Sequence, residues 1–497
     1  MPRVPLVSGA YQSRSLIAGA QRCVNLYPES NQKNEQAPVP VTHYPTAGTT
    51  LYYDNQVSFK CRCLYRTSLG KLYAVIGQTV YIVVDQPLTN TAAAIPIGTI
   101  DVGESQVYMT DNGLCAVLTD GSAFGYAIDL QSNLFGKIVS PNWHSADFCV
   151  YIDTFFIFNR KGTNQFFISD SMANFSLLTT ISVTNPNGAF DPLDVAAKSG
   201  SGDPIVSIST THNDLWLIGE LTTEIWNGTG SADFYFQRQG GSFIDHGIAA
   251  KYSIGTQDIF NFWVMRDRQG DALIVEGANY QVKEISTSAI TTILKTFPTI
   301  DDAIGYTYQY SDHAFYVVTF PSGNRTFAFE LNTRQWHELA WLDINGGLNR
   351  HRGNCAAFAF GKNIIGDWET GNLFVLNPDV FTDAGAPIPR IRTFPHMIQD
   401  GKRVMYKQFI IDMQTGTIPT EDTNQPPLIN LRWSDDRGVT YGNAVQNSIG
   451  KTGEYLTQIS FWRLGTARDR VFEISWSAPI RTALNGAFVE VSAVSKT

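Results

Sequence analysis

The feature that most constrains the fold of this chain is a repeated pair of short apolar strands joined by a polar turn. In the first copy, Leu72–Ile76 and Val80–Val84 flank Gly77 and Gln78. Successive copies start about 40 to 60 residues apart, close to the period of a β-propeller blade. The other pairs are Cys115–Leu118 with Phe124–Ile128, Thr154–Phe158 with Gln165–Ile168, Leu215–Ile218 with Thr223–Trp226, Phe262–Met265 with Ala272–Val275, Phe315–Phe320 with Thr326–Leu331, and Cys355–Phe360 with Leu373–Leu376. We therefore predict an all-β chain built around a β-propeller of six or seven blades. Stacked sandwiches remain the alternative, because the repeats share no strict motif.

The composition agrees with short strands rather than helices. Aromatic residues make up 12% of the chain. Aromatic and β-branched side chains suit pleated, half-buried surfaces. Helical periodicity is scarce, and the one helix we predict runs from Ser13 to Val24. Charged residues are only 16% of the chain, against about 25% in typical soluble domains. This low charge density suits a subunit that buries much surface against its neighbours.

Changes in composition divide the chain into three parts. Residues 1–40 are rich in Pro, Asn, Gln and Ser, and we predict an extended N-terminal arm that lies over a neighbouring molecule. Residues 41–380 contain the repeats and form the predicted β-propeller. A connector rich in Pro, Asp and Gly, Pro378–Pro389, leads into residues 381–497. We predict that this last part is a C-terminal β unit, either sandwich-like or closing the propeller. Its predicted strands are Tyr406–Met413, Leu428–Ser434, Tyr455–Leu464, Arg470–Ser477 and Ala487–Val494.

The charge balance limits how this chain can deal with nucleic acid. It has 36 basic and 45 acidic residues, a formal net charge of −9. An acidic protein does not gain affinity for phosphates by releasing counterions, so neither sequence-specific nor general DNA binding is expected. Repulsion of the phosphate backbone helps DNA to slide past a surface. The sequence therefore argues against a DNA-binding module and permits a conduit for DNA.

Cysteine usage and hydropathy indicate where the chain folds. The six cysteines contain no CxxC pair. Cys61 and Cys63 share one face of a strand and are poorly placed to bridge each other. We expect all six to be reduced thiols of a protein that folds in a reducing cytoplasm. We expect neither a signal peptide nor a membrane-spanning segment, because no apolar run of the required length occurs.

No constellation in the sequence predicts catalysis, a cofactor or a metal ion. HExxH, GxSxG and Cys-His protease arrangements are missing, and the histidines are scattered. Glu220 and Glu224 beside Trp226 admit a sugar site, but a hairpin turn with a packed Trp explains the same residues. His337, which we predict on a turn, is assigned to the surface or to an interface. We expect no enzyme activity.

One turn motif lies in the C-terminal part. Ser434, Asp436, Gly438, Thr440 and Tyr441 spell S-x-D-x-G-x-T-aromatic and resemble the Asp-box hairpin of sialidases and other β proteins. In such a turn the carboxylate accepts backbone amides, and the glycine takes the left-handed conformation. The motif occurs once, so we interpret it as a folding device.

Further motifs follow one another in a specific order from one end of the chain to the other. They are Tyr11–Ser15, Asn25–Glu29, Gly219–Trp226 with Gly228, Phe262–Val264, Phe315–Pro321 with Trp336-His337-Glu338, Gly366-Asp367-Trp368 with Gly371–Phe374, and Trp462–Glu473. Together they resemble the packaged-DNA stabilisation proteins of short-tailed phages, which are tail nozzle or head-closure accessory subunits. The sequence departs from this pattern at Gly48, where Thr46-Ala47-Gly48 replaces an expected Pro-Gly turn.

The resemblance implies a structural virion protein without catalysis. It implies a hexameric ring in the phage tail, below the portal and adaptor rings, that extends the DNA exit channel and helps to retain the packaged genome. Other implied partners are tail proteins such as fibres or a plug, and DNA passes through without sequence-specific binding. Arg463, Arg468, Asp469 and Arg470 are expected in ion pairs within the domain or between subunits. The motif residues with an implied structural role are Asn25, Tyr27, Pro28, Glu29, Glu220, Glu224, Trp226, Asp367, Arg463, Arg468 and Asp469. The alternative is a tail-associated protein that binds or degrades polysaccharide.

Overall fold

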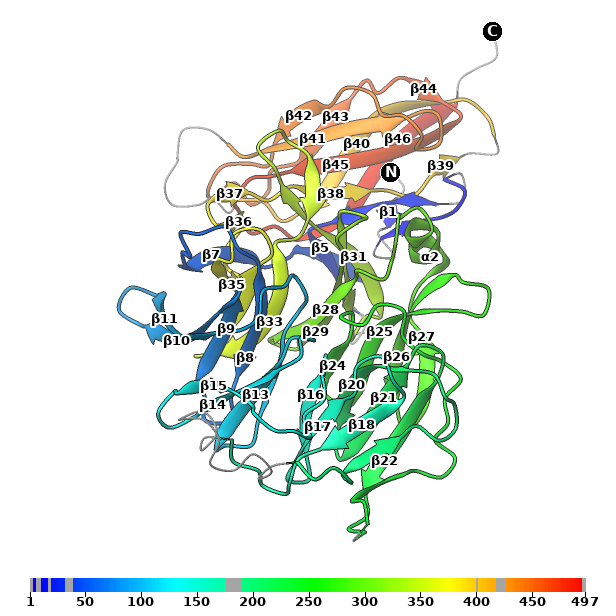
Figure 1. The fold of residues 1–497 in the computed structure, drawn as a ribbon. Helices are drawn as coiled ribbons and strands as arrows, with labels where there is room; N and C mark the ends of the chain where they lie inside the picture. Colours follow the sequence, from blue (N-terminus) through cyan, green and yellow to red (C-terminus); the bar gives the residue numbers. More distant parts are fainter. Residues whose placement is uncertain are drawn as a thin grey trace.

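The structure is a computed structural model that describes residues 3–5, 10–16, 19–31, 39–175, 190–231, 233–398, 401–416 and 426–493. The molecule consists of a ring of small sheets and a β-sandwich beside the ring (Figure 1). Nearly all its elements are strands. The helix α2 (Ser288–Leu294) is capped by Thr287, whose side chain accepts the amide of Ile290.

Five four-stranded antiparallel sheets follow one another along the chain and form the first five blades of a propeller. Blade 1 consists of β8 (Cys61–Arg66), β9 (Leu72–Ile76), β10 (Thr79–Gln86) and β11 (Thr91–Thr99). Blade 2 consists of β12 (Tyr108–Asp111), β13 (Cys115–Thr119), β14 (Gly125–Asp129) and β15 (Phe135–Lys137). Blade 3 consists of β16 (Cys149–Ile152), β17 (Phe155–Asn159), β18 (Gln165–Ile168) and β19 (Val195–Ala197). Blade 4 consists of β20 (Ile205–Thr211), β21 (Asp214–Gly219), β22 (Thr223–Gly228) and β23 (Phe236–Arg238). Blade 5 consists of β24 (Gly255–Gln257), β25 (Phe260–Arg266), β26 (Ala272–Ala278) and β27 (Gln281–Glu284).

Two more blades belong to larger sheets and complete the ring. Blade 6 consists of β28 (Ile304–Tyr310), β29 (His313–Phe320), β30 (Arg325–Glu330) and β31 (Gln335–Leu342), and β32 (Leu348–Arg350) extends β31. Blade 7 consists of β33 (Gly353–Ala359), β34 (Lys362–Asp367), β35 (Leu373–Asn377) and β7 (Gly48–Tyr53). The prediction of an all-β chain with a propeller is therefore confirmed, and the described residues form seven blades.

The sequence repeats correspond to the middle strands of the blades. β9 and β13 are buried along their whole length, because each lies between two other strands and both sheet faces pack on neighbouring blades. Strands of this kind read as continuous apolar runs. Only the last repeat differs, because Cys355–Phe360 and Leu373–Leu376 fall on β33 and β35, with β34 between them.

An early strand of the chain closes the ring. β7 pairs antiparallel with β35, so that Thr50 lies opposite Val375, and the inner strands β33 and β8 lie side by side. Asp85 on β10 adds a polar link, because it accepts hydrogen bonds from Tyr52 on β7 (2.6 Å) and Lys362 on β34 (2.8 Å). The first and last blades are thus joined by backbone pairing and by side chains.

The C-terminal part is a β-sandwich next to blades 6 and 7. One sheet contains β43 (Ile459–Trp462), β40 (Val404–Met413), β46 (Leu484–Ala493), β6 (Val41–Pro45), β5 (Leu26–Ser30), β1 (Arg3–Pro5) and β44 (Thr466–Ala467). The facing sheet contains β4 (Cys23–Val24), β38 (Arg390–Thr393), β45 (Asp469–Trp476), β41 (Leu428–Ser434), β42 (Val445–Ser448) and β39 (Met397–Ile398). Phe409 and Phe472 stack between the sheets with ring centroids 4.4 Å apart. The end of the last predicted strand, Val494, lies outside the described residues.

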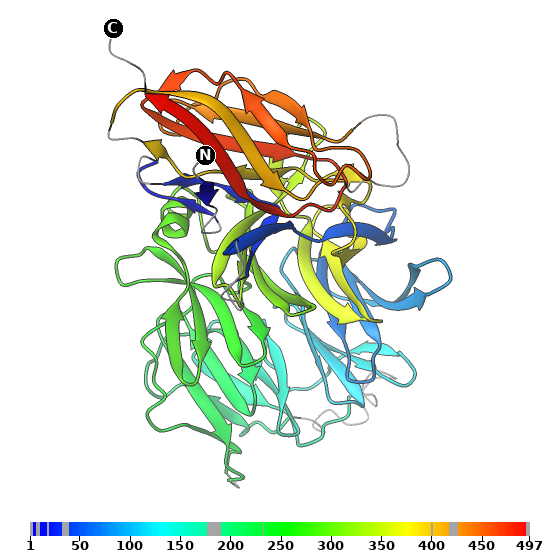
Figure 2. The ribbon, with the colours of Figure 1, turned by 180° about the vertical axis from the view of Figure 1, so that it is seen from behind.

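The described part of the N-terminal segment lies between the two bodies, which corrects two expectations. We predicted an arm over a neighbour for residues 1–40, but β4 and β5 are buried within their own chain, between sandwich and propeller (Figure 2). β4 pairs with β38 of the sandwich and with β31 of blade 6. The predicted helix from Ser13 to Val24 is also wrong: β2 (Tyr11–Gln12) and β3 (Ala20–Gln21) form a small antiparallel pair there. Tertiary pairing overrides the weak helical pattern.

The connector at Pro378–Pro389 is folded as well. β36 (Thr382–Asp383) and β37 (Ala386–Pro387) form a small hairpin, and Asp383 lies beside Thr49 of β7. Gly48 lies at the start of β7 and not in a turn. The departure of Thr46-Ala47-Gly48 from the expected Pro-Gly turn had already put that turn in doubt. The Gly48 amide donates to Val380 O (2.9 Å), and a Cβ here would collide with the carbonyl oxygens of Val380 and Thr382.

We predict that Gly48→Ala weakens ring closure. Overpacking against backbone that cannot rotate away should lower the free energy of unfolding by about 1–3 kcal/mol, measured by urea denaturation. Gly202→Ala is the matched control, because nothing lies within 4 Å of that position and its φ is not positive. It should change stability by less than about 0.5 kcal/mol. Equal effects of the two substitutions would contradict the closure described here.

Candidate functional site

The bore of the propeller contains a small cavity among the inner strands of blades 1, 2, 5, 6 and 7. Its cavity measures about 160 Å³ and is lined by residues of the inner strands or just before them, among them Arg62, Tyr65, Tyr108, Tyr252 and Tyr306. Arg62 is almost fully buried, and its guanidinium donates to Ser105 O (2.6 Å) and Gly77 O (3.0 Å). The cavity therefore has room for a few water molecules. A DNA duplex, whose major groove alone is about 12 Å wide, cannot pass through it.

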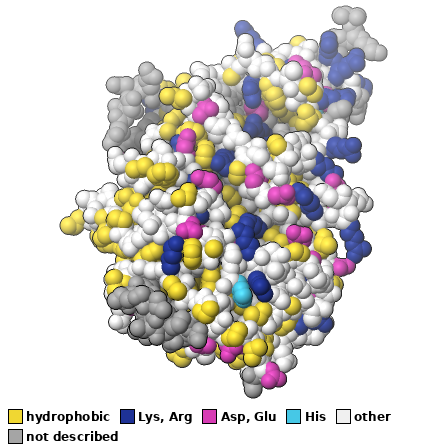
Figure 3. Space-filling model, viewed as in Figure 1, with side chains coloured by type: hydrophobic (Ala, Val, Ile, Leu, Met, Phe, Trp, Pro, Cys, Tyr) yellow, Lys and Arg dark blue, Asp and Glu magenta, His cyan; other side chains and the backbone are white. Residues whose placement is uncertain are grey.

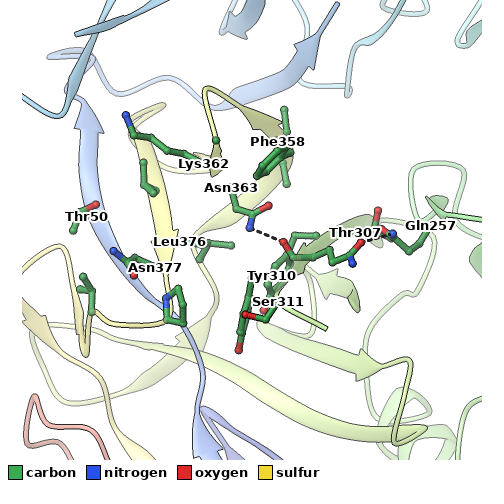
Figure 4. A pocket seen from close by; sticks show the side chains of 18 of the residues that line it. Thr50, Gln257, Thr307, Tyr310, Ser311, Phe358, Lys362, Asn363, Leu376 and Asn377 are labelled. Atoms are coloured by element: carbon green, nitrogen blue, oxygen red, sulfur yellow. Dashed lines mark hydrogen bonds between the residues drawn. The ribbon is translucent and has the colours of Figure 1, made fainter. Parts of the chain in front are cut away.

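A larger groove of about 950 Å³ opens between blades 6 and 7 (Figure 4). Asn363 donates to Gln309 O (2.7 Å) across the boundary between the two blades, and Gln257 donates to the side chain of Gln309 (3.2 Å). Lys362 turns to Asp85. None of the residues that line the groove carries a carboxylate, an imidazole or a thiol. The groove therefore lacks the paired acids that general acid–base cleavage of a glycoside needs.

Glu220 and Glu224 do not converge on a common site. Glu220 is exposed at the turn after β21, whereas Glu224 on β22 is fully buried. The Glu224 carboxylate accepts from Trp226 Nε1 (3.0 Å) and from the amides of Ser199 (3.3 Å) and Gly200 (2.5 Å). These bonds fix the loop before blade 4 to the blade itself. The arrangement supports a structural role for Glu224 and Trp226.

The Asp-box-like residues form a hydrogen-bonded turn at the end of β41. Asp436 Oδ1 accepts from Ser434 Oγ (2.6 Å) and from the amide of Thr440 (2.8 Å), and Ser434 Oγ accepts from the amide of Gly438 (2.7 Å). The Ser434 hydroxyl and the other donors lower the pKa of Asp436 to about 2. Gly438 has a φ of 92°, and Arg432 lies over the ring of Tyr441 at 4.8 Å. Every oxygen contact serves the turn.

Asn25 connects both bodies of the molecule. Its side chain donates to Ala340 O (2.9 Å) on blade 6 and to Pro389 O (2.8 Å) in the connector, and it accepts the amide of Ala340 (2.9 Å). Its backbone amide donates to Glu338 O (2.8 Å), and its φ is 53°. Asn tolerates this left-handed conformation better than other residues with a Cβ. Asn25 therefore fixes the sandwich on the propeller.

Tyr27, Pro28 and Glu29 continue along the same junction on β5. The Tyr27 ring packs 5.0 Å from His313 and edge-on to Phe315 at 5.7 Å, and burial raises the pKa of Tyr27 to about 12. Pro28 is buried opposite His43, and Glu29 Oε2 lies 3.6 Å from His313 Nε2. This short motif therefore packs against the part of blade 6 that contains His313 and Phe315 on β29.

His337 corrects our assignment to a turn at the surface or an interface. It lies within β31 and is completely buried beside Tyr27 and Phe315. Neither ring nitrogen has a hydrogen-bond partner among the described residues. Burial lowers the pKa of His337 to about 4, because the apolar surroundings disfavour the cation. β31 is buried on both faces from Trp336 to Ala340, and its polar residues His337 and Glu338 gave no sign of this burial in the sequence.

The remaining motif residues lie in separate places. Asp367 is fully buried and accepts from Arg352 (2.7 Å) and from the amide of Glu369 (3.0 Å). Asp469 contacts His396 Nδ1 (2.8 Å) and Arg437 Nε (3.2 Å). Asp469 thus forms ion pairs within the sandwich, one of the two kinds of pair that the resemblance implies.

Of the other three arginines, one is buried and two are exposed. Arg470 is buried and pairs with both oxygens of Asp435 (2.6 and 2.8 Å). Arg463 and Arg468 are exposed, and no carboxylate of the described chain lies within ion-pair distance of either. Figure 3 shows Lys and Arg gathered along one edge of the molecule, over sandwich and propeller alike.

One buried ion pair, between Lys198 and Asp203, was not predicted from the sequence. Lys198 is fully buried and donates to Asp203 Oδ1 (2.9 Å) and to Thr222 O (2.8 Å). Hydrogen bonds from Lys198, Leu221 and Thr222 lower the pKa of Asp203 despite the opposing effect of burial. Asp203 ends the segment Ser199–Asp203 (SGSGD), whose composition is typical of a flexible loop and does not indicate this pairing.

Within the described ranges, no group of three or more His, Cys, Asp or Glu side chains is arranged to hold a metal ion. No helix of the described chain is long and apolar enough to cross a membrane. The structure thus brings the sequence-predicted residues together only in small structural groups, of which the junction around Asn25 is the most connected.

Comparison with known proteins gives two family matches. Residues 2–381 match the β-propeller of bacteriophage P22 Gp10, described as a phage stabilisation domain, and residues 390–492 match the β-sandwich of the same protein. No curated protein sequence matches the chain.

Two solved structures are also similar. The computationally designed Ika8 protein is 10% identical, with 75% of this chain and 99% of that chain covered and a TM-score of 0.36. PorZ, a surface component of the type-IX secretion system of Porphyromonas gingivalis, is 12% identical. The match covers 69% of this chain and 38% of PorZ, with a TM-score of 0.37. At these TM-scores, neither structure supports an inference about this chain.

We predict that Asn25→Ala destabilises the junction by about 2–4 kcal/mol. The substitution leaves the buried amide and carbonyl of Ala340 without partners, at about 1–3 kcal/mol for each buried group. Urea unfolding measures the loss. The control is Asn90→Ala, at an exposed position with nearly the same φ of 52°, which should cost only the left-handed strain of about 1 kcal/mol. Similar losses at both positions would show that the Asn25 side chain does not hold the junction.

We also predict that His337 makes the protein less stable in acid. The pKa of His337 is lower in the folded chain, so the unfolded chain binds the proton first. Stability should therefore fall as the pH drops from 6.5 to about 4, by roughly 3 kcal/mol in total at about 1.4 kcal/mol for each pKa unit. Denaturant unfolding across this pH range should show a shallower slope for His337→Leu than for the natural chain. The same substitution at the exposed His246 should leave the slope unchanged, and an unchanged slope in His337→Leu would refute the assignment.

Proposed function

The chain belongs to the family of the bacteriophage P22 Gp10 phage stabilisation protein, and on this basis we propose that it forms a ring in the tail of a short-tailed phage. In this proposal six copies surround the DNA exit channel below the portal and adaptor rings. They extend the channel as a nozzle and help to retain the packaged DNA. Fibres or a plug would attach to the same ring.

The observation that carries the proposal is the small size of the cavity among the inner strands of the propeller. Because the cavity among the inner strands measures only about 160 Å³, we infer that DNA does not pass through a single propeller. A channel built from this chain must therefore lie between copies, with each propeller as a solid block of the wall. The net charge of −9 favours a wall that DNA slides past.

The surface supports contacts between unlike faces of neighbouring copies. The hairpin of β10 and β11 projects from blade 1 and carries no charged residue from Gln86 to Ile100. Val84, Leu88 and Ile95 on this hairpin are exposed. Figure 3 shows hydrophobic side chains on this edge and basic side chains on the opposite edge. A closed ring joins two different faces of each copy, as such an asymmetry permits.

Other properties fit assembly inside the host and release within a virion. All six cysteines are free thiols, in agreement with folding in the host cytoplasm.

A polysaccharide-binding or glycan-degrading role is the competing proposal, but Glu220 and Glu224 point to different environments and no carboxylate lines the main groove.

We expect the purified chain to join the portal–adaptor complex of its phage as six copies, even where it stays monomeric alone. Native mass spectrometry of the mixture counts the copies. Leu88→Asp should reduce incorporation at least tenfold, because a buried unpaired charge at an interface costs several kcal/mol. The same change at the fully exposed Ile344, outside the hairpin, is the control.

Two results would overturn this proposal. One is a folded chain that never joins the complex. The other is release of reducing sugar from host envelope glycans by the purified chain, abolished in Glu220→Gln, which would favour the competing role.

A further inference from the structure

Two thiols face each other where the propeller ring closes. Cys61 lies on β8, the inner strand of blade 1, and Cys355 lies on β33, the inner strand of blade 7. Their sulfur atoms are 3.6 Å apart, although the residues are 294 positions apart in the chain. This is the contact between the first and the last blade, so a bond between the two sulfurs would close the ring covalently.

Irregular backbone on both strands brings the two sulfurs together. β8 shifts its register against β9 between Cys61 and Cys63, and β33 shifts its register against β34 between Gly353 and Cys355. Bulges of this kind re-aim a side chain. A regular strand places Cys61 beside Cys63 on one face, whereas these shifts turn Cys61 toward Cys355.

The surroundings leave room for the sulfur pair and hold its strands in place. A Cβ at Gly366 would overlap Cys61 Sγ and lie 3.0 Å from Cys355 Sγ, so the glycine provides the space that the thiols occupy. Asn354 donates to Cys61 O (2.7 Å) and to the side chain of Gln106 (2.9 Å). These bonds fix the two inner strands relative to each other.

A small oxidant can reach the pair. Cys355 lines the open part of the bore and is only partly buried, while Cys61 is fully buried behind it. Burial, together with the neighbouring Cys61, raises the pKa of the Cys355 thiol. Because the thiolate is the reactive form, oxidation should be slow at neutral pH and faster in alkaline solution.

We propose that Cys61 and Cys355 are an oxidation site at which a peroxide converts the two thiols into a disulfide that staples blade 1 to blade 7. The Cys355 sulfur attacks one peroxide oxygen, the O–O bond breaks, and a sulfenic acid and one water form. The Cys61 sulfur then attacks the sulfenic sulfur, the S–O bond breaks, and a second water leaves. The thiols lose two electrons and two protons, and the peroxide takes up both. The staple concerns the chain's own ring and does not depend on the proposed assembly of copies.

Under the proposed function, the chain folds in the reducing host cytoplasm and meets oxidising conditions once the virion is released. A disulfide stabilises by restricting the unfolded chain, and more so when it closes a long loop. Oxidation would then add a covalent bond to a closure that is otherwise held by β7 pairing and side-chain hydrogen bonds.

The test is treatment of the purified full-length chain with hydrogen peroxide, followed by alkylation and trypsin digestion without reductant. Trypsin cuts after Lys60, Arg62, Arg352 and Lys362, so the two thiols fall in the peptides CR and GNCAAFAFGK. We expect these peptides to appear linked, with two hydrogen atoms fewer than their sum, and faster at pH 9 than at pH 7. The midpoint of thermal unfolding should rise by several degrees and return after reduction.

Controls separate this pair from other thiols. Cys63 falls in the peptide CLYR, so its involvement is visible directly. Cys355→Ser should abolish the link and the thermal shift, and Cys115→Ser, a buried thiol elsewhere in the ring, should preserve both. The proposal is overturned if the wild-type peptides stay unlinked while Cys355 is oxidised to sulfinic acid or remains open to alkylation, or if Cys355 links to Cys63 instead.

Discussion

The structure depends on the pairing of β7 with β35, which closes a ring of seven sheets. A blade with an open edge exposes a row of unpaired backbone groups, and a radial array protects these edges only if its last blade meets its first. Here the closing strand comes from residues 48–53 and its partner from residues 373–377. The closure must therefore bridge more than 300 residues, and it encloses all the blades between the two strands. The Asp85 contacts to Tyr52 and Lys362 reinforce the same joint.

The segment that closes the ring also builds the junction with the sandwich. β4 and β5 precede β7 directly, and they pair with both bodies before the chain enters the propeller. Asn25 carries the most contacts at this point, because its side chain reaches blade 6 and the connector at once. A rigid unit follows, in which the sandwich cannot turn freely relative to the ring. Such a unit suits the wall of a channel better than two domains on a flexible linker.

The sequence predicted the middle strands of the blades well, and the elements around them poorly. Strands such as Leu72–Ile76 are buried on both faces and appear as apolar runs, whereas an inner strand such as Tyr108–Asp111 is short and only partly apolar. The strand β7 was not predicted, because its partner β35 is distant in the chain and no local sequence pattern indicates such pairing. Glu224 and Trp226 lie in a hydrogen-bonded blade, as the interpretation as a hairpin with a packed Trp expected, but His337 was misplaced. The contact between Cys61 and Cys355 arises from two register shifts that the alternating pattern of a strand does not reveal.

The central claim is that each copy is a closed block and that DNA passes between copies. A cryo-EM reconstruction of the intact tail, at a resolution that separates the blades, tests it most directly. The proposed assembly predicts six copies around the tail axis, continuous DNA density on that axis, and side-chain density filling every propeller bore. Duplex density inside a propeller bore, or copies attached away from the axis, would contradict it.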